Sequence, residues 1–174
     1  MFKELNILRL FFESPTKEFN VRELARILKI SPATSSSELK KFAKNGILVK
    51  RKERILDLYK SNLDNELYKD LKTFYNIRRI KDVGLLDALN NFYLKPAIVL
   101  FGSSSFGLDA ETSDWDIFVL SENTKEFPDL KKFEDKMKKP IQIFAAKNIR
   151  DLKNPHLINN VLNGIKLQGK IEWT

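Results

Sequence analysis

Residues 97–120, AIVLFGSSSFGLDAETSDWDIFVL, decide the fold of the C-terminal half of this 174-residue chain. The wholly apolar run at residues 97–101 predicts a buried strand, which breaks at Gly102. A second strand-like run begins at Asp114. Because alternate side chains of a strand share a face, Asp114 and Asp116 are predicted to point the same way, and the apolar residues between and after them toward a core.

This pair of carboxylates indicates a particular chemistry. Two carboxylates close together on one strand face repel each other, and a divalent cation between them relieves the repulsion. Gly102 and Ser103 are predicted to open a short helix, where glycine lets a phosphate approach the backbone and the serine hydroxyl and backbone N–H groups hold it. A cation site beside a phosphate site is the equipment for phosphoryl or nucleotidyl transfer.

The spacing of these residues resembles the nucleotidyltransferase signature of the DNA polymerase beta superfamily, and is most similar to the minimal nucleotidyltransferases of archaea and bacteria. The resemblance covers roughly residues 93–174 and rests on the string Gly102-Ser103-x3-Gly107-x5-Ser113-Asp114-x-Asp116. It implies a small mixed β-sheet with helices. It also implies transfer of a nucleoside monophosphate, usually AMP, from a nucleoside triphosphate to an acceptor hydroxyl.

The resemblance also assigns roles to residues. It implies that Asp114 and Asp116 are catalytic and bind Mg²⁺ or Mn²⁺. It implies a nucleotide site made of Gly102, Ser103, Gly107 and Ser113.

One position departs from the family pattern. The family places a third carboxylate on a later strand, here predicted at residues 140–144, and the matching position holds Gln142. A neutral amide is a poor metal ligand and cannot act as a base. Glu134 and Asp135 on the preceding lysine-rich helix would replace it only if the backbone brought them in.

The first third of the chain is strongly basic. Residues 1–60 contain 14 Lys and Arg against 7 Asp and Glu, a net charge of +7, whereas residues 61–174 contain 17 against 16, a net charge of +1. A basic module joined to a nearly neutral one indicates that the first contacts a polyanion. We therefore expect double-stranded DNA as a partner of residues 1–60.

The local patterns in this basic segment predict a helix-turn-helix followed by a hairpin. Helices are predicted at 2–12, 20–28 and 32–44, with Asn20 capping the second and Ser31 capping the third. Residues 47–59 read as two strands joined by a cationic turn, and the whole resembles the winged helix-turn-helix domains of prokaryotic regulators. The predicted DNA contacts are Ser31, Thr34, Ser35, Ser37, Lys40, Lys41, Lys50, Arg51, Lys52 and Arg54.

The chain is thus predicted to be α+β, with a DNA-binding domain at 1–60, a helical connector at 61–92 and a nucleotidyltransferase-like domain at 93–174. Helices are predicted at 63–80 and 85–94 within the connector, and such rigid helices would suit a homodimer. We expect Trp115 in the core, and Asp109 and Glu111 in a solvent-facing loop.

Composition excludes several classes of function. The chain has no cysteine and one histidine, which removes disulfide frameworks, thiol catalysis and multi-histidine metal sites. No apolar run approaches the ~20 residues that span a bilayer, so we expect no membrane partner and a cytoplasmic location.

Three functions remain open: a nucleotidyltransferase carried to DNA, a DNA-binding regulator whose degenerate nucleotidyltransferase-like domain senses nucleotide, and a member of a toxin–antitoxin-like pair with a helical partner protein.

Overall fold

A computed structural model describes residues 3–171, so Phe2, the first residue of the predicted N-terminal helix, lies outside the described residues. The fold is α+β, and the chain divides into two compact units between Tyr75 and Asn76. This boundary falls inside α4 (Glu66–Asp82), so the expected separate connector at 61–92 is not what the structure has. The physical reason is that the apolar faces of its helices are buried within the two cores, Tyr75 in one and Ile80 in the other.

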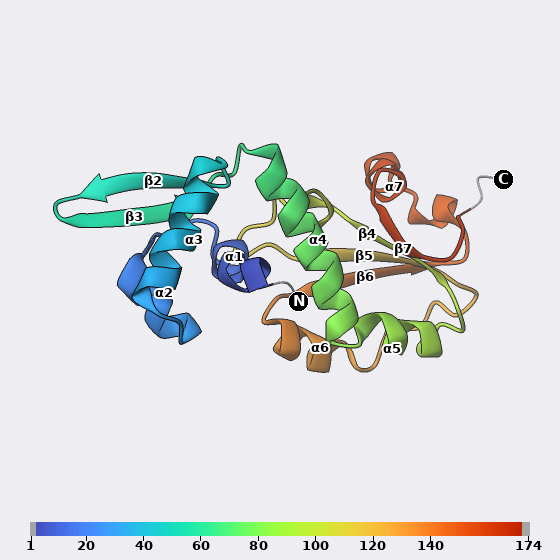
Figure 1. Ribbon diagram of the computed structural model, residues 1–174. Helices are drawn as coiled ribbons and strands as arrows, with labels where there is room; N and C mark the ends of the chain where they lie inside the picture. Colours follow the sequence, from blue (N-terminus) through green and yellow to red (C-terminus); the bar gives the residue numbers. More distant parts are fainter. Residues whose placement is uncertain (1–2, 172–174) are drawn as a thin grey trace. The chain divides into compact units, whose positions relative to one another are not determined.

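The N-terminal unit joins three helices to a small antiparallel sheet. In the sheet the order is β1-β3-β2, and the β2–β3 hairpin extends away from the three helices (Figure 1). Phe11, Leu24, Leu39 and Tyr59 are almost completely buried in its core. Its elements are α1 (Lys3–Glu13), β1 (Phe19–Asn20), α2 (Val21–Leu28), α3 (Pro32–Lys44), β2 (Leu48–Glu53) and β3 (Leu56–Ser61).

The predicted helix caps of this unit are confirmed. The Asn20 side chain accepts a hydrogen bond from the Glu23 N–H at 3.0 Å, which fixes the start of α2. Ser31 Oγ accepts one from the Thr34 N–H at 3.0 Å, and Pro32 is the first residue of α3. Local side-chain chemistry therefore sets both helix starts.

The C-terminal unit is built on a four-stranded mixed sheet. The strand order is β6-β5-β4-β7, with β5 and β6 parallel and the other neighbours antiparallel. No helix among residues 3–171 is both long and apolar enough to cross a bilayer. The elements after α4 are α5 (Leu85–Phe92), β4 (Ala97–Phe101), η1 (Ser103–Phe106), β5 (Trp115–Leu120), α6 (Leu130–Met137), β6 (Ile141–Ala146), η2 (Ile149–Leu152), α7 (Pro155–Leu162) and β7 (Ile165–Gln168).

Helices cover both faces of this sheet. One face packs against α5 and α6, and the other against η2 and α7 (Figure 1). Trp115 belongs to the first cluster and is 1% exposed, which confirms the core position predicted for it. Phe118 belongs to the second cluster. Since strand side chains alternate, Asp116 lies on the same face as Phe118, the face that α7 covers in part.

Candidate functional site

The bend after β4 lies directly against one carboxylate. Gly102 has φ +70° and ψ −162°, a backbone conformation essentially confined to glycine. A Cβ atom placed on Gly102 would lie 2.3 Å from Oδ2 of Asp116, so no side chain fits there. Phe101, the last residue of β4, pairs with Asp116 across the antiparallel ladder. The bend at Gly102 and the carboxylate of Asp116 are therefore in direct contact.

Asp114 and Gln142 belong to the same cluster. In the parallel pairing of β5 with β6, Gln142 stands beside Asp116. Its side-chain Nε2 donates a hydrogen bond of 2.5 Å to Oδ2 of Asp114. The structure thus brings together Asp116 of β5, Gln142 of the neighbouring β6, and Asp114, which directly precedes β5.

The electrostatics of this cluster favour a bound cation. Burial raises the pKa of Asp116 above its usual value, and the negative charge of Asp114 raises it further. Residues 3–171 contain no group of three or more His, Asp, Glu or Cys side chains arranged to hold a metal. Mg²⁺ commonly binds proteins through one or two carboxylates plus the phosphates of its substrate, so Asp114 and Asp116 fit that ion.

The serines after Gly102 divide into two kinds. The hydroxyls of Ser104 and Ser105 donate to the carbonyls of Phe101 and Gly102, at 3.2 and 2.8 Å, and so build the turn. Ser103 Oγ has no hydrogen-bond partner among the residues that the structure describes, and its side chain is half-buried beside Gly102. Of the three, Ser103 is the one whose hydroxyl is available to a ligand.

The loop between the two halves of the motif is held from inside the protein. Ser113 Oγ accepts a hydrogen bond from the Ala110 N–H at 2.8 Å, so it also closes a turn. Asp109 is 3% exposed and accepts a 2.8 Å bond from Asn76, which corrects the expectation that it faces solvent. Lys139 is buried and donates to the carbonyl oxygens of Ala110 and Glu111.

Asn76 and Lys139 are the residues that sequence reasoning missed. Each lies about thirty positions from the loop that it anchors, and no local pattern signals such a pairing. Gly107 ends η1 with φ +66°, as expected of a glycine at that position.

Neither acid of α6 replaces the missing carboxylate. Glu134 Oε1 accepts the backbone N–H of Ile141 at 3.1 Å and so caps the start of β6. Asp135 pairs with Lys131 at 3.1 Å on the exposed side of the helix. The backbone therefore does not bring either of them to Asp116.

In the N-terminal unit, most of the residues predicted to contact DNA are exposed. Ser35 is the exception, because it is fully buried and its hydroxyl donates to the Val21 carbonyl at 3.0 Å. That prediction is wrong: Ser35, the fourth residue of α3, points to α2 and holds the two helices together. The exposed residues are Ser31, Thr34, Ser37, Lys40, Lys41, Lys50, Arg51, Lys52 and Arg54.

Two of the hairpin cations are already paired within the protein. Arg51 makes two hydrogen bonds of 2.6 Å to the carboxylate of Glu18, and these hold the pKa of Glu18 below its usual value. Lys50 contacts Asp57 at 2.8 Å, a hydrogen bond that raises the pKa of Lys50. Among the predicted DNA contacts on the hairpin, Lys52 and Arg54 are the two cations without an ion pair within residues 3–171.

Comparison with known protein families gives one match, in the C-terminal half of the chain. Residues 84–167, just under half of the chain, match the family model described as a nucleotidyltransferase domain, which supports a nucleotidyltransferase-like domain in the C-terminal unit. No curated protein matches the chain. A solved structure described as a possible transcriptional regulator from Methanosarcina mazei Go1 is similar at 18% identity, over 50% of this chain and 78% of that one, with a TM-score of 0.37.

Proposed function

We propose that the C-terminal unit binds a nucleoside triphosphate, with ATP the first to test, together with Mg²⁺ or Mn²⁺. It transfers the nucleoside monophosphate to an acceptor hydroxyl, breaking the bond between the α- and β-phosphates and releasing pyrophosphate. The observation that carries this proposal is the contact between the side-chain-free bend at Gly102 and the carboxylate of Asp116. A polyphosphate lying on the bend would be next to the acidic pair. The family match over residues 84–167 supports the same reaction class.

Each residue of the site has a distinct role in this proposal. Gly102 leaves the backbone open to a phosphate, and the Ser103 hydroxyl is available to donate to a phosphate oxygen. Asp114 and Asp116 would hold the divalent cation. When bound, this cation would neutralise the negative charge of the phosphates and make the acceptor hydroxyl easier to deprotonate. Asn76 and Lys139 keep the intervening loop in place and are positioning residues.

Transfer is tested with ATP labelled at the α-phosphate, Mg²⁺ and candidate acceptors. Wild type is expected to transfer label, and Asp116→Asn to abolish both transfer and Mg²⁺-dependent ATP binding. Asp135→Asn is the matched control, because it removes an exposed acid that pairs with Lys131 on the surface of α6. Equal ATP binding by wild type and Asp116→Asn would place the site elsewhere.

A second function is favoured by one observation. The amide of Gln142 occupies the position of the third carboxylate and donates to Asp114. Such a site keeps two acidic ligands but lacks a proton acceptor for the incoming hydroxyl. The alternative is therefore a DNA-binding regulator in which nucleotide binding to the C-terminal unit changes DNA affinity without turnover.

The substitution Gln142→Glu separates the two functions, because glutamate has nearly the same shape and exchanges a donor for an acceptor. If wild type transfers slowly for lack of a base, Gln142→Glu raises the rate. If wild type binds ATP without transfer and ATP changes its affinity for duplex DNA, the regulator function holds. Transfer by wild type that Gln142→Glu abolishes would show that the amide is itself required.

DNA binding by the N-terminal unit is part of both versions of the proposal. The exposed hydroxyls at the start of α3 would face base edges, and Lys40, Lys41, Lys52 and Arg54 would neutralise phosphates. Fluorescence anisotropy with labelled duplex DNA over a range of salt concentrations measures this. An absence of binding at low salt would remove DNA from the proposal.

A further inference from the structure

The outer edge of β6 carries backbone groups that no other strand uses. β6 is the terminal strand of its sheet and pairs only with β5. The Trp115 N–H donates to the Pro140 carbonyl and the Ser121 N–H to the Ala146 carbonyl, so even-numbered residues of β6 turn their backbone groups toward β5. Backbone direction alternates along a strand, so residues 141, 143 and 145 turn theirs outward.

Two of these outward positions are open. The Ile141 N–H is bonded to the Glu134 carboxylate. The N–H and C=O groups of Ile143 and Ala145 make no backbone or side-chain hydrogen bond outside the sheet among residues 3–171. They are spaced two residues apart, which is the repeat with which one strand bonds to another.

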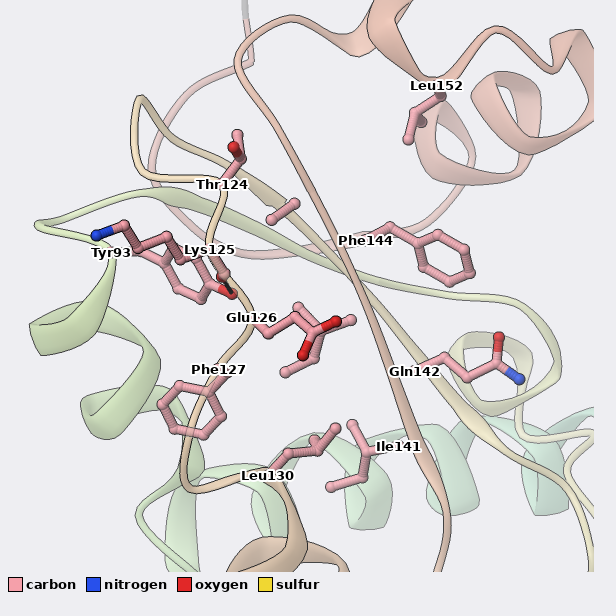
Figure 2. Close-up of a pocket in the computed structure, with 12 residues that line it drawn as sticks. Tyr93, Thr124, Lys125, Glu126, Phe127, Leu130, Ile141, Gln142, Phe144 and Leu152 are labelled. Atoms are coloured by element: carbon pink, nitrogen blue, oxygen red, sulfur yellow. Dashed lines mark hydrogen bonds between the residues drawn. The ribbon is translucent and has the colours of Figure 1, made fainter.

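A pocket of about 660 Å³ runs along this edge. Figure 2 shows residues 124–127 descending beside β6, with the side chains of Gln142 and Phe144 directed to the far side of the strand. The wall at 124–127 is fixed in place, since Tyr93 Oη donates to the Lys125 carbonyl at 2.9 Å and Phe127 packs on Phe92. The pocket is therefore a formed feature between a strand edge and a braced segment.

We infer that this edge is a binding site for an extended polypeptide segment of a partner protein, which adds to the sheet as a strand beside β6. The open N–H and C=O groups of Ile143 and Ala145 would pair with its backbone. Alternate side chains of the segment would then face Phe127 and Leu130 on one side, and Phe144 and Leu152 on the other.

The lining excludes the other obvious occupant. A nucleic acid strand needs a positively charged groove along its backbone. The only charged side chains in this pocket are Lys125 and Glu126, which cancel. Apolar and aromatic side chains make up most of the rest, as suits a polypeptide with alternating apolar residues. A docked segment would lie about 5 Å from β6, beside the strand that carries Gln142, and about 10 Å from β5, the strand that carries Asp116.

The probe for this site is a heptapeptide selected from a random phage-displayed library on the full chain and then synthesised. Its binding is expected to slow amide hydrogen exchange at Ile143 and Ala145 in the ¹⁵N-labelled wild type. Ala145→Pro removes one outward N–H at an edge, where proline is tolerated, and is expected to weaken the peptide about tenfold. Ala145→Ser is the matched control, because it keeps the N–H and should bind like wild type.

Several results would overturn the inference. One is a selection that enriches no peptide, or peptides that leave the exchange of the two amides unchanged. Another is protection of the same amides by duplex DNA, which would make the occupant a nucleic acid. A third is their protection without peptide, together with a dimer detected by sedimentation, which would make the occupant a second copy of the chain. The exchange measurement uses the wild type, so it decides even if Ala145→Pro fails to fold.

Discussion

Replacing Gly102 by alanine tests the geometry on which the nucleotide site depends. The new Cβ atom would lie 2.3 Å from Oδ2 of Asp116, against an ordinary separation of about 3.5 Å between non-bonded atoms. The backbone conformation, φ +70° and ψ −162°, adds strain of about 1–3 kcal/mol for any residue with a side chain. The carboxylate of Asp116 must move away from the bend, and with it the proposed cation ligand.

Gly84 provides the matched comparison. It also has a positive φ, +79°, but a Cβ atom placed there meets nothing within 4 Å. Gly84→Ala should therefore cost only backbone strain, about 1–2 kcal/mol, and leave nucleotide binding unchanged. Gly102→Ala should cost about 3 kcal/mol or more in the free energy of unfolding, because the clash adds to the strain, and should abolish Mg²⁺-dependent ATP binding.

Urea unfolding followed by the fluorescence of Trp115, in a Trp173→Phe background, measures the two costs, and calorimetry measures ATP binding. Combining Gly102→Ala with Asp116→Ala removes the atom that the new Cβ meets, so the double variant should recover about 1 kcal/mol relative to the sum of the single changes. Asp116 would not lie against the bend if Gly102→Ala lowered the free energy of unfolding no more than Gly84→Ala, and if the effects of Gly102→Ala and Asp116→Ala were additive.

Three further predictions concern other parts of the molecule. Burial and the charge of Asp114 raise the pKa of Asp116 in the folded chain above its ordinary value of 3.8. Between pH 3.8 and the raised pKa the folded chain therefore binds more protons at this carboxyl than the unfolded chain, and its stability falls as the pH rises. Without divalent cations, Asp116→Asn should therefore have a higher free energy of unfolding than wild type at neutral pH and the same value below pH 3.8. In DNA titrations, Lys52→Ala should reduce the slope of log affinity against log salt by about 1, and Lys50→Ala by less because Asp57 already pairs with Lys50; equal slopes would refute the assignment. Ser35→Ala should lower stability by about 1 kcal/mol in thermal unfolding through loss of its bond to the Val21 carbonyl, with DNA affinity of the folded chain unchanged.

Local patterns in the sequence predicted the framework of the site well. The apolar run predicted as a strand at 97–101 is β4, with the same bounds. Asp116 is the second residue of β5 and lies beside Gly102, and Asp114 directly precedes β5. The caps at Asn20 and Ser31 followed from rules that act within three residues. Such features depend on near neighbours in the chain, so one sequence is enough to find them.

Features that depend on distant partners were not predictable. Strand β2 continues to Glu53, and β3 begins at Leu56. The basic residues 50–52 therefore pair in register with β3 and do not form a loop. Asp109 is buried only because Asn76 comes to it from α4. Ser35 resembles its exposed neighbours in sequence, and only the packing of α2 on α3 turns it inward. In each case tertiary contact overrides a reasonable local expectation.

Gln142 shows why binding and transfer must be considered separately in this domain. With a third acid beside Asp114 and Asp116, three carboxylates would share one strand end, and their repulsion would make the site depend on its cation. With the amide, the repulsion is between two carboxylates only, and the hydrogen bond from Nε2 holds Asp114 in place without a metal. The amide thus favours a site that is already formed before the proposed nucleotide binds, and it cannot take a proton from the proposed acceptor as a carboxylate could. Nucleotide affinity that survives in Gln142→Ala, with Asp114 no longer held, would show that the amide contributes nothing to forming the site.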